Sequence, residues 1–259
     1  MSANKDSIGR TILVTVLLCV VCSVVVSAAA VLLKPQQVAN KELDRKTNIL
    51  AAAGLLDPSK SVDELFSQIT TKIVDTETGK FSDAVDAETY DALKASKDPE
   101  MSRALSREED IASIKREARY QTVYLVEKEG QLDSIILPVH GYGLWSTLYG
   151  FLALEGDLNT VVGLGFYSHA ETPGLGGEVD NPKWKALWPG KKIYEEGTWS
   201  PEIHLIKGNV DPSSPSSQYQ VDGLSGATLT SNGVTHLVQF WMGENGYAPF
   251  LKNRKAGEA

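Results

Sequence analysis

The chain has 259 residues, of which 42% are hydrophobic and 22% are charged, and its formal net charge is -8. This length holds one substantial core plus an anchor, or two small domains. An acidic chain without a long basic run argues against nucleic-acid binding, because phosphate contacts need clustered Lys and Arg. The two cysteines, Cys19 and Cys22, lie in the apolar N-terminal run, which excludes a disulfide framework or a cysteine-based zinc site in the rest of the chain. Their spacing puts them on one helix face, where small apolar filler is a simpler interpretation than lipidation or iron binding.

Residues 11–33 carry no charge, and the run is longer than the roughly 20 residues that a helix needs to cross a bilayer. The sequence therefore predicts an N-terminal tail over 1–10 and a transmembrane helix over 11–33. A cleaved signal peptide is the alternative, because Ser27 to Ala30 are small residues of the kind found at cleavage sites. The length of the run favours an uncleaved anchor. The Lys and Arg residues that flank the run do not settle its orientation.

Residues 34–117 are predicted to form a membrane-proximal helical and connecting region. Apolar residues at helical spacing indicate a helix over 38–53. Ser61 can cap a second short helix that continues to Ile69. The stretch 75–115 is polar and charged, and we interpret it as a surface excursion.

Residues 118–259 are predicted to form an α+β domain, in which helices pack around an antiparallel sheet. Apolar runs predict strands over 118–127, 133–139, 151–155, 161–168 and 203–207, of which the first four form two hairpins. A short helix is expected over 181–188 and a longer one over 233–242, which Thr230, Ser231 or Asn232 can cap and which Gly243 stops.

Two candidate ligand-binding runs follow predicted strands. The Trp145 run, residues 141–147, contains Tyr142 and Trp145, which could stack on a ring or fill the core. The Glu171 run, residues 169–177, has three glycines around Leu175, so its backbone could lie flat against a planar ligand. Glu171 and its neighbour Thr172 could hydrogen-bond the polar edge of such a ligand. Taken alone, the second run also fits an ordinary glycine loop with solvated polar residues.

A third run, the Thr228 run of residues 222–231, lies directly before the predicted terminal helix. Gly226 and Ala227 keep the turn open, so that a bulky group could approach the backbone. A phosphate held at Thr228, just before the helix, would meet free backbone N–H groups and the positive end of the helix dipole. When the run is considered alone, a simple turn with a helix cap is the more common explanation of these residues.

Together the three runs resemble the FMN-binding domain shared by the C subunit of the sodium-translocating NADH:quinone oxidoreductase and the sister G subunit of the Rnf electron-transport complex. The matching residues are 141–146, 169–176 and 222–231. In that family, the Thr of a Ser-Gly-Ala-Thr motif receives FMN through a phosphoester bond, attached by a flavin transferase that uses FAD. The resemblance maps this attachment to Thr228. The polar excursion before Lys115 and the ending from Trp241 to Phe250 favour the C subunit over the G subunit.

The resemblance implies an electron carrier within a multi-subunit redox complex whose other subunits oxidise NADH, move sodium and reduce ubiquinone. It places the chain in the lipid bilayer of the bacterial inner membrane as a single-pass protein, with a cytoplasmic N-terminus and a periplasmic main domain, 118–259. FMN is then the cofactor, with Thr228 as its covalent anchor. The remaining implied site residues are Ser225, Gly226, Ala227 and Thr230 at the phosphate, Glu171, Thr172, Leu175 and Gly176 along the ring or ribityl chain, Trp145 and Ser146 opposite, and Lys207 as a further polar contact.

Several alternatives stay open at this point. Residues 223–227 superficially resemble the nucleophile elbow of a serine hydrolase, with His169 or His236 as the base, but a glycine directly follows Ser225 and breaks that pattern. A non-flavin exported binding module could use the same fold. The four histidines are too scattered for a zinc site, and the chain has no complete dinucleotide or P-loop fingerprint, which argues against its own NADH or ATP site.

Overall fold

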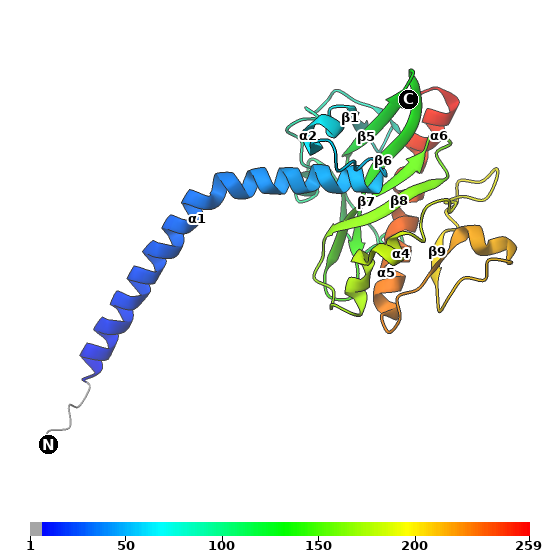
Figure 1. Cartoon of the computed structure of the whole chain (residues 1–259). Coiled ribbons are helices and arrows are strands. Elements are labelled where there is room, and N and C mark those ends of the chain that lie inside the picture. Colours follow the sequence, from blue (N-terminus) through cyan, green and yellow to red (C-terminus); the bar gives the residue numbers. More distant parts are fainter. Residues whose placement is uncertain (1–6) are drawn as a thin grey trace. The chain divides into compact units, whose positions relative to one another are not determined.

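The computed structural model describes residues 7–259, and the chain divides into two compact units, Met1–Asp44 and Arg45–Ala259 (Figure 1). Among the described residues, one helix, α1 (Ile8–Ala52), is long and apolar enough to cross a membrane. The predicted transmembrane stretch 11–33 lies within it, and every side chain of that stretch is exposed. An apolar helix surface of this length is stable in the hydrocarbon core of a bilayer, which is where the surface of a membrane-spanning helix lies. Most of the predicted tail, 1–10, lies outside the described residues.

The Arg45–Ala259 unit is built on a six-stranded sheet with the order β2-β1-β5-β6-β7-β8, in which all neighbours are antiparallel. Its strands are β1 (Ile69–Asp75), β2 (Lys80–Phe81), β5 (Tyr120–Lys128), β6 (Gln131–Tyr142), β7 (Thr147–Glu155) and β8 (Val161–Ser168). Both predicted hairpins are confirmed. The turn between β6 and β7 is a third hairpin loop, and it contains most of the Trp145 run.

Two strands of this sheet were not predicted from the sequence. β1 pairs with β5 along its whole length, and β2 pairs with the end of β1. Ser61 does cap α2 (Val62–Phe66), but the prediction that this helix reaches Ile69 is wrong, because Ile69 is the first residue of β1. Region 34–117 therefore contributes strands to the same sheet as the predicted domain 118–259.

The alternation of side chains along the strands separates two cores on the two faces of the sheet. On one face, Ile136 and Phe151 pack with Leu50 near the end of α1 and with the α2 segment. On the other face, Leu137 and Leu152 pack with the buried side of α5 (Thr228–Met242), which carries the larger core. The three motif runs all lie at the ends of elements that this second core fixes in place.

Shorter elements complete the unit. They are α3 (Ala92–Ala95), β3 (Ser102–Ala104), β4 (Arg116–Ala118), η1 (Gly176–Asp180), α4 (Pro182–Lys185), β9 (His204–Ile206), η2 (Pro215–Tyr219), β10 (Gln220–Asp222) and α6 (Ala248–Ala256). The predicted strand at 203–207 is confirmed as β9, which pairs in parallel with β10. The predicted helix at 181–188 is shorter than expected, and α6 was not predicted.

Helix α5 begins at Thr228 and not at Gly233 as predicted. The prediction that residues 230–232 cap it is wrong, because Ala227 precedes the first helical residue and no side chain caps the helix. The Ser231 hydroxyl instead donates to the Ala227 carbonyl at 3.1 Å. A Cβ on Gly233 would lie 2.5 Å from the carbonyl oxygen of the last residue of β6. Close packing against β6 therefore supports a first turn that a sequence pattern alone would not predict.

Side chains from the C-terminal part of the chain pair with the free edge of β6. β5 pairs with β6 only as far as Ile136, beyond which the two strands diverge. The Pro138 carbonyl accepts a hydrogen bond from the Tyr247 hydroxyl at 2.9 Å, and the His140 carbonyl accepts one from the Trp241 indole N–H at 2.7 Å. These bonds satisfy strand carbonyls that would otherwise lack partners, and they fix the end of α5 against β6.

Candidate flavin site

The three runs meet at one end of the Arg45–Ala259 unit. In Figure 1 the β6–β7 turn, the segment after β8 and the start of α5 all lie at the lower end of this unit. Close contacts confirm the convergence of the Glu171 and Thr228 runs. A Cβ on Gly176 would lie 2.5 Å from Thr230 Oγ1, and one on Gly226 would lie 3.1 Å from Leu175. Gly226 also has a φ of 72°, which favours glycine at this turn.

A single carboxylate joins all three runs. Glu171 Oε1 accepts hydrogen bonds from the backbone N–H groups of Leu144, Trp145 and Ser146 at 3.1, 3.0 and 3.3 Å. Glu171 Oε2 accepts one from the Thr230 hydroxyl at 2.8 Å. We call this arrangement the Glu171 clamp. Glu171 is 5% exposed and Thr230 is fully buried, so the clamp is an internal support and not a surface contact.

The Glu171 clamp keeps its carboxylate ionised. Burial raises the pKa of Glu171, but the hydrogen bonds from Trp145, Thr230, Leu144 and Ser146 lower it, and the net pKa lies below the ordinary value of 4.5. An ionised carboxylate only accepts hydrogen bonds, which matches the four donors around it. The site therefore contains a fixed negative charge with both oxygens bonded to the protein.

Thr228 is exposed and occupies the first position of the 15-residue helix α5. The N–H groups of residues 228–230 make no hydrogen bond to any described part of the protein, as is usual for the first turn of a helix. Ser225 and Gly226 beside it are exposed, whereas Ala227 is buried. An anion at the Thr228 oxygen would therefore find free N–H donors and the positive end of the helix dipole.

The other predicted site residues divide into exposed groups and supports. Thr172 is exposed, and Ser146 Oγ accepts the Ala170 N–H at 2.7 Å. Thr230 supports the site through Glu171, and its hydroxyl does not face the Thr228 oxygen as an open donor. Lys207 is exposed directly after β9, and in the described chain its ammonium group has no hydrogen-bond or ion-pair partner.

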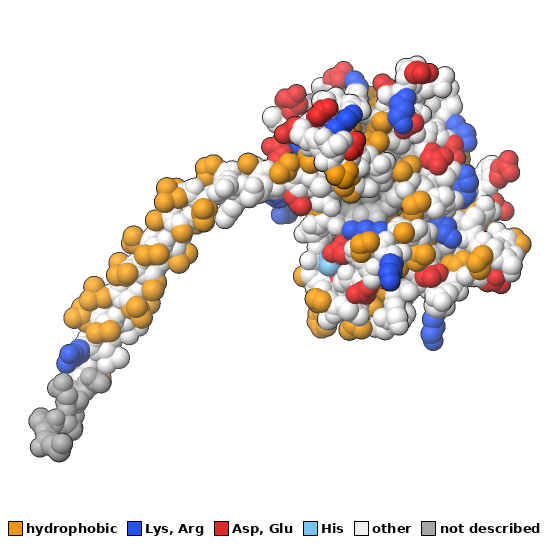
Figure 2. All heavy atoms as spheres, in the orientation of Figure 1, with side chains coloured by type: hydrophobic (Ala, Val, Ile, Leu, Met, Phe, Trp, Pro, Cys, Tyr) orange, Lys and Arg blue, Asp and Glu red, His pale blue; other side chains and the backbone are white. Residues whose placement is uncertain are grey.

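Large apolar side chains are exposed around this site. Of the seven exposed large hydrophobic residues in Arg45–Ala259, five belong to the three runs: Tyr142, Leu144, Trp145, Leu175 and Leu229. Figure 2 shows hydrophobic side chains gathered at the lower end of the unit, where α5 begins. Trp145 is 66% exposed, which excludes the alternative that it fills the core. Exposed apolar groups that cluster in this way mark a binding surface.

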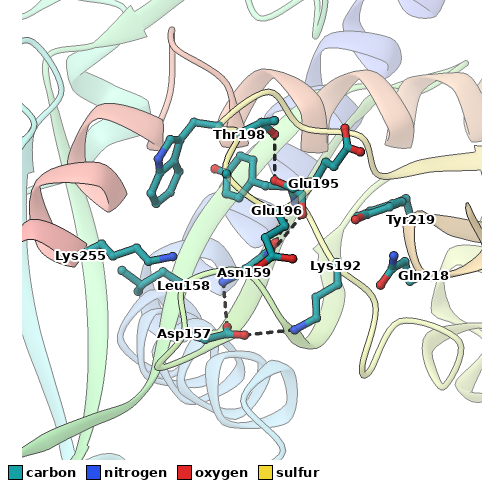
Figure 3. Close-up of a pocket in the computed structure, with 13 residues that line it drawn as sticks. Asp157, Leu158, Asn159, Lys192, Glu195, Glu196, Thr198, Gln218, Tyr219 and Lys255 are labelled. Carbon is teal, nitrogen blue, oxygen red and sulfur yellow. Dashed lines mark hydrogen bonds and ion pairs between the residues drawn. The ribbon is translucent and has the colours of Figure 1, made fainter.

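A separate cleft lies elsewhere in the described protein. It has a volume of about 410 Å³ and is lined by residues outside the three runs (Figure 3). Several of its polar side chains already have partners: Lys192 Nζ lies 3.2 Å from Asp157 Oδ2, and the Asn159 carboxamide oxygen accepts the backbone N–H groups of Ile193 and Tyr194. The three runs form a stronger candidate site than this cleft, because large apolar side chains are exposed there. The candidate site is consequently an open surface.

The serine hydrolase alternative lacks a nucleophile–base pair in the described chain. Ser225 makes no hydrogen bond to a histidine there, and His169 is bonded to Asp180 and to the Glu171 backbone. His236 is an exposed residue of α5. A hydrolase needs its base within hydrogen-bond reach of the nucleophile, so this geometry favours the other interpretations of the Thr228 run.

Comparisons with known proteins agree with the geometry. Residues 143–243 match a family model described as the FMN-binding domain. The chain is 60% identical to the C subunit of the Na+-translocating NADH-quinone reductase of Pseudomonas aeruginosa, over 99% of this chain and 100% of that protein. It is 48% identical to the protein of the same name from Vibrio alginolyticus, over 100% of this chain and 99% of that one.

Solved structures show the same fold. The crystal structure of Shewanella oneidensis NqrC matches with a TM-score of 0.77 and 33% identity, over 84% of this chain and 99% of that chain. The crystal structure of the C subunit of the Na+-translocating NADH-quinone reductase from Parabacteroides distasonis matches with a TM-score of 0.65 and 28% identity, over 85% of this chain and 96% of that chain. The matched family model spans nearly all of the three runs.

Proposed function

The chain belongs to the family of the C subunit of Na+-translocating NADH-quinone reductase, and from this premise we propose that it carries FMN bound covalently, through a phosphoester bond, to the Thr228 hydroxyl. It is an electron-transfer subunit with an FMN-binding domain and a single transmembrane anchor. This membership confirms the resemblance to the C subunit that the three runs indicated, and it disfavours the alternative of a G subunit of the Rnf complex.

The observation that supports the attachment site most directly is the position of Thr228. Its exposed side chain begins α5, beside N–H groups that have no acceptor in the described protein. A phosphate needs such donors, and they replace the basic patch that this acidic chain lacks. Gly226, two residues earlier, has the positive φ that glycine favours and forms the turn that leads into the helix. The residues present therefore fit the phosphate end of FMN.

The exposed apolar side chains fit the other end of the cofactor. Trp145, Leu175 and Leu229 offer flat or branched apolar surface next to the Thr228 run, as a ring system requires. FMN, when bound, supplies the redox chemistry, and the chain supplies position and electrostatics. The Glu171 clamp holds the two loops that carry Trp145 and Leu175, and its negative charge disfavours the addition of an electron nearby.

The proposal also includes maturation, partners and topology. A flavin transferase would join the Thr228 oxygen to the FMN phosphorus of FAD, while the bond to AMP breaks and AMP takes up the hydroxyl proton. The partners are the other subunits of the membrane complex and the lipid bilayer. We place the N-terminus in the cytoplasm and the FMN-binding domain, 118–259, in the periplasm, with 34–117 as the membrane-proximal region and 11–33 as the span.

The attachment can be tested by mass spectrometry of the intact full-length chain from cells that contain the transferase. The expected mass increase is one FMN less one water. Thr228→Ala should abolish it, whereas Thr172→Ala, which removes another exposed threonine of the site, should retain it. A wild-type chain with the mass of the bare polypeptide, or a Thr228→Ala chain that still carries flavin, would contradict the proposal.

A further inference from the structure

His169 lies between the Glu171 clamp and Asp180, and its contacts fix which ring nitrogen carries the proton. The backbone N–H of Glu171 donates to His169 Nδ1 at 3.1 Å. His169 Nε2 lies 2.8 Å from Asp180 Oδ2. Only an unprotonated ring nitrogen can accept an N–H, so Nδ1 carries the lone pair and Nε2–H donates to the carboxylate.

We propose that His169 is a positioning residue of the flavin site, held by Asp180 in the Nε2–H tautomer so that Nδ1 anchors the backbone of Glu171. The term flavin site rests on the function proposed above, but the hydrogen bonds do not. His169 is 12% exposed and Asp180 is 51% exposed, so the carboxylate orients a largely shielded ring from its solvent side. A carboxylate that fixes the tautomer of a histidine is a recurring device in metal and catalytic sites.

The anchor acts at the centre of the site. A side-chain acceptor that bonds the N–H two residues later has the same form as an Asx turn. This hydrogen bond restrains the backbone of Glu171. The N–H of the preceding residue, Ala170, donates to Ser146 Oγ at 2.7 Å. Without the Nδ1 acceptor, the Glu171 backbone loses one of its restraints, so its carboxylate should leave the three N–H groups of residues 144–146 more often.

The anchor requires the neutral ring. A second proton on Nδ1 would face the N–H of Glu171, donor against donor, and would break the bond. The charged groups on the elements that adjoin His169 are Glu178 and Asp180 on η1 and Lys183 and Lys185 on α4. Lys185 Nζ lies 3.6 Å from Asp180 Oδ1, and Glu178 accepts a hydrogen bond from Asn181 at 2.7 Å. Asp180 is thus the charged group that bonds the ring directly.

The tautomer can be read from nitrogen-15 NMR of the histidines in the full chain, in detergent micelles and without flavin. The chain provides its own control, because His204 Nδ1 lies 2.7 Å from the Glu202 carbonyl and must carry the proton when neutral. In one spectrum, we expect the neutral ring of His169 as Nε2–H and the neutral ring of His204 as Nδ1–H. A His169 ring that is protonated on Nδ1, whether neutral or charged, would overturn the proposal.

Variants separate positioning from general damage. Amide exchange at residues 144–146 should become about tenfold faster in His169→Ala, because the Glu171 clamp opens more often. His169→Asn should restore the wild-type exchange, since its Oδ1 can accept the Glu171 N–H. His204→Ala serves as the matched control and should change nothing at these amides. Unchanged exchange in His169→Ala, or no rescue by His169→Asn, would overturn the proposal.

Two further measurements test the same proposal independently of these exchange rates. If His169→Ala does not fold, Asp180→Ala should still show a mixture of His169 tautomers, and a pure Nε2–H signal there would refute the role of Asp180. In flavin-loaded protein, His169→Ala should shift the flavin midpoint potential and His169→Asn should return it. Exchange and tautomer are measured on the bare chain, so failure of flavin attachment and failure of the His169 anchor give different results.

Discussion

Gly176 is the position where one added methyl group should disrupt the site most selectively. A Cβ there would lie 2.5 Å from Thr230 Oγ1 and 2.7 Å from Glu171 Oε2, the two atoms that share a 2.8 Å hydrogen bond. The backbone of Gly176 does not have a positive φ, so alanine is allowed conformationally. The effect of Gly176→Ala is therefore steric, and it falls on the Glu171 clamp.

The expected magnitude has two parts. Forcing a methyl group into a packed site costs about 1–3 kcal/mol. Loss of a hydrogen bond to a charged group costs about 1.5–3 kcal/mol. The sum predicts that Gly176→Ala lowers the free energy of unfolding by about 2.5–6 kcal/mol. At about 2–4 °C per kcal/mol for a domain of this size, the melting temperature should fall by roughly 5–24 °C.

Thermal unfolding of the full chain in detergent, followed by circular dichroism, measures this loss. Gly165→Ala is the matched control, because a Cβ at Gly165 would meet nothing within 4 Å and its φ is not positive. The double variant Gly176→Ala/Thr230→Ala should lose at least about 1 kcal/mol less than the sum of the single variants, since removal of the hydroxyl makes room for the methyl group. If Gly176→Ala has the same melting temperature as Gly165→Ala, the steric reasoning is refuted.

Three further predictions concern single contacts. The pKa of Glu171 is lower in the folded chain than its ordinary value of 4.5. The ionised carboxylate therefore stabilises the fold above pH 4.5, and this stabilisation is lost as the pH falls through the lower folded pKa. In urea unfolding across acidic pH, Glu171→Gln should lose less stability than the wild type. Burial raises the pKa of Glu117 to about 7 despite Arg103, so stability is fully present below 4.5 and falls as pH rises through 7. At pH 8, Glu117→Gln should be more stable than the wild type by up to about 3 kcal/mol, and equal stability would contradict the burial argument. Trp241→Phe leaves the His140 carbonyl without its donor and should destabilise by about 1–3 kcal/mol, whereas Trp199→Phe, whose ring makes no described hydrogen bond, should lose less in the same urea titration.

The parts of the fold that the sequence predicted are those with local causes. The strands β5 to β8 follow one another as hairpins, so each strand pairs with a neighbour in the chain, and each contains a run of apolar residues. The cap at Ser61 and the stop at Gly243 depend on residues within one turn of the helix end. Such signals are readable without knowledge of the tertiary structure.

The parts that the sequence did not predict depend on distant partners. β1 is a partly polar strand, and its place in the sheet comes from β5, far along the chain. α6 has few apolar residues, and Phe250 and Leu251 are buried only because the fold provides a core for them. α5 starts early because β6 packs against Gly233, a residue that disfavours helix when considered alone.

The site follows the same division. The three runs indicated the loops that the structure brings together, because glycines and small residues mark places where a ligand can approach the backbone. The sequence interpretation assigned Glu171 to the polar edge of the ligand, whereas the structure bonds both of its oxygens to the protein. It also gave His169 no role beside Glu171 and Asp180. The role of Glu171 depends on three separate segments, so it becomes visible only when the fold brings those segments together.

The openness of the site supplies a physical reason for the tether that we propose. Ligands that are held without a covalent bond usually sit in concave sites that bury 70–90% of their surface. Here the apolar groups stand on an exposed surface, and the 410 Å³ cleft that would bury a ligand lies outside the three runs. A bond at Thr228 would turn weak surface contacts into intramolecular ones, which raises the local concentration of the ring without any further contact. The same exposure leaves the ring edge accessible to a redox partner. In this view, an open surface can serve electron exchange only because the cofactor is tied to it.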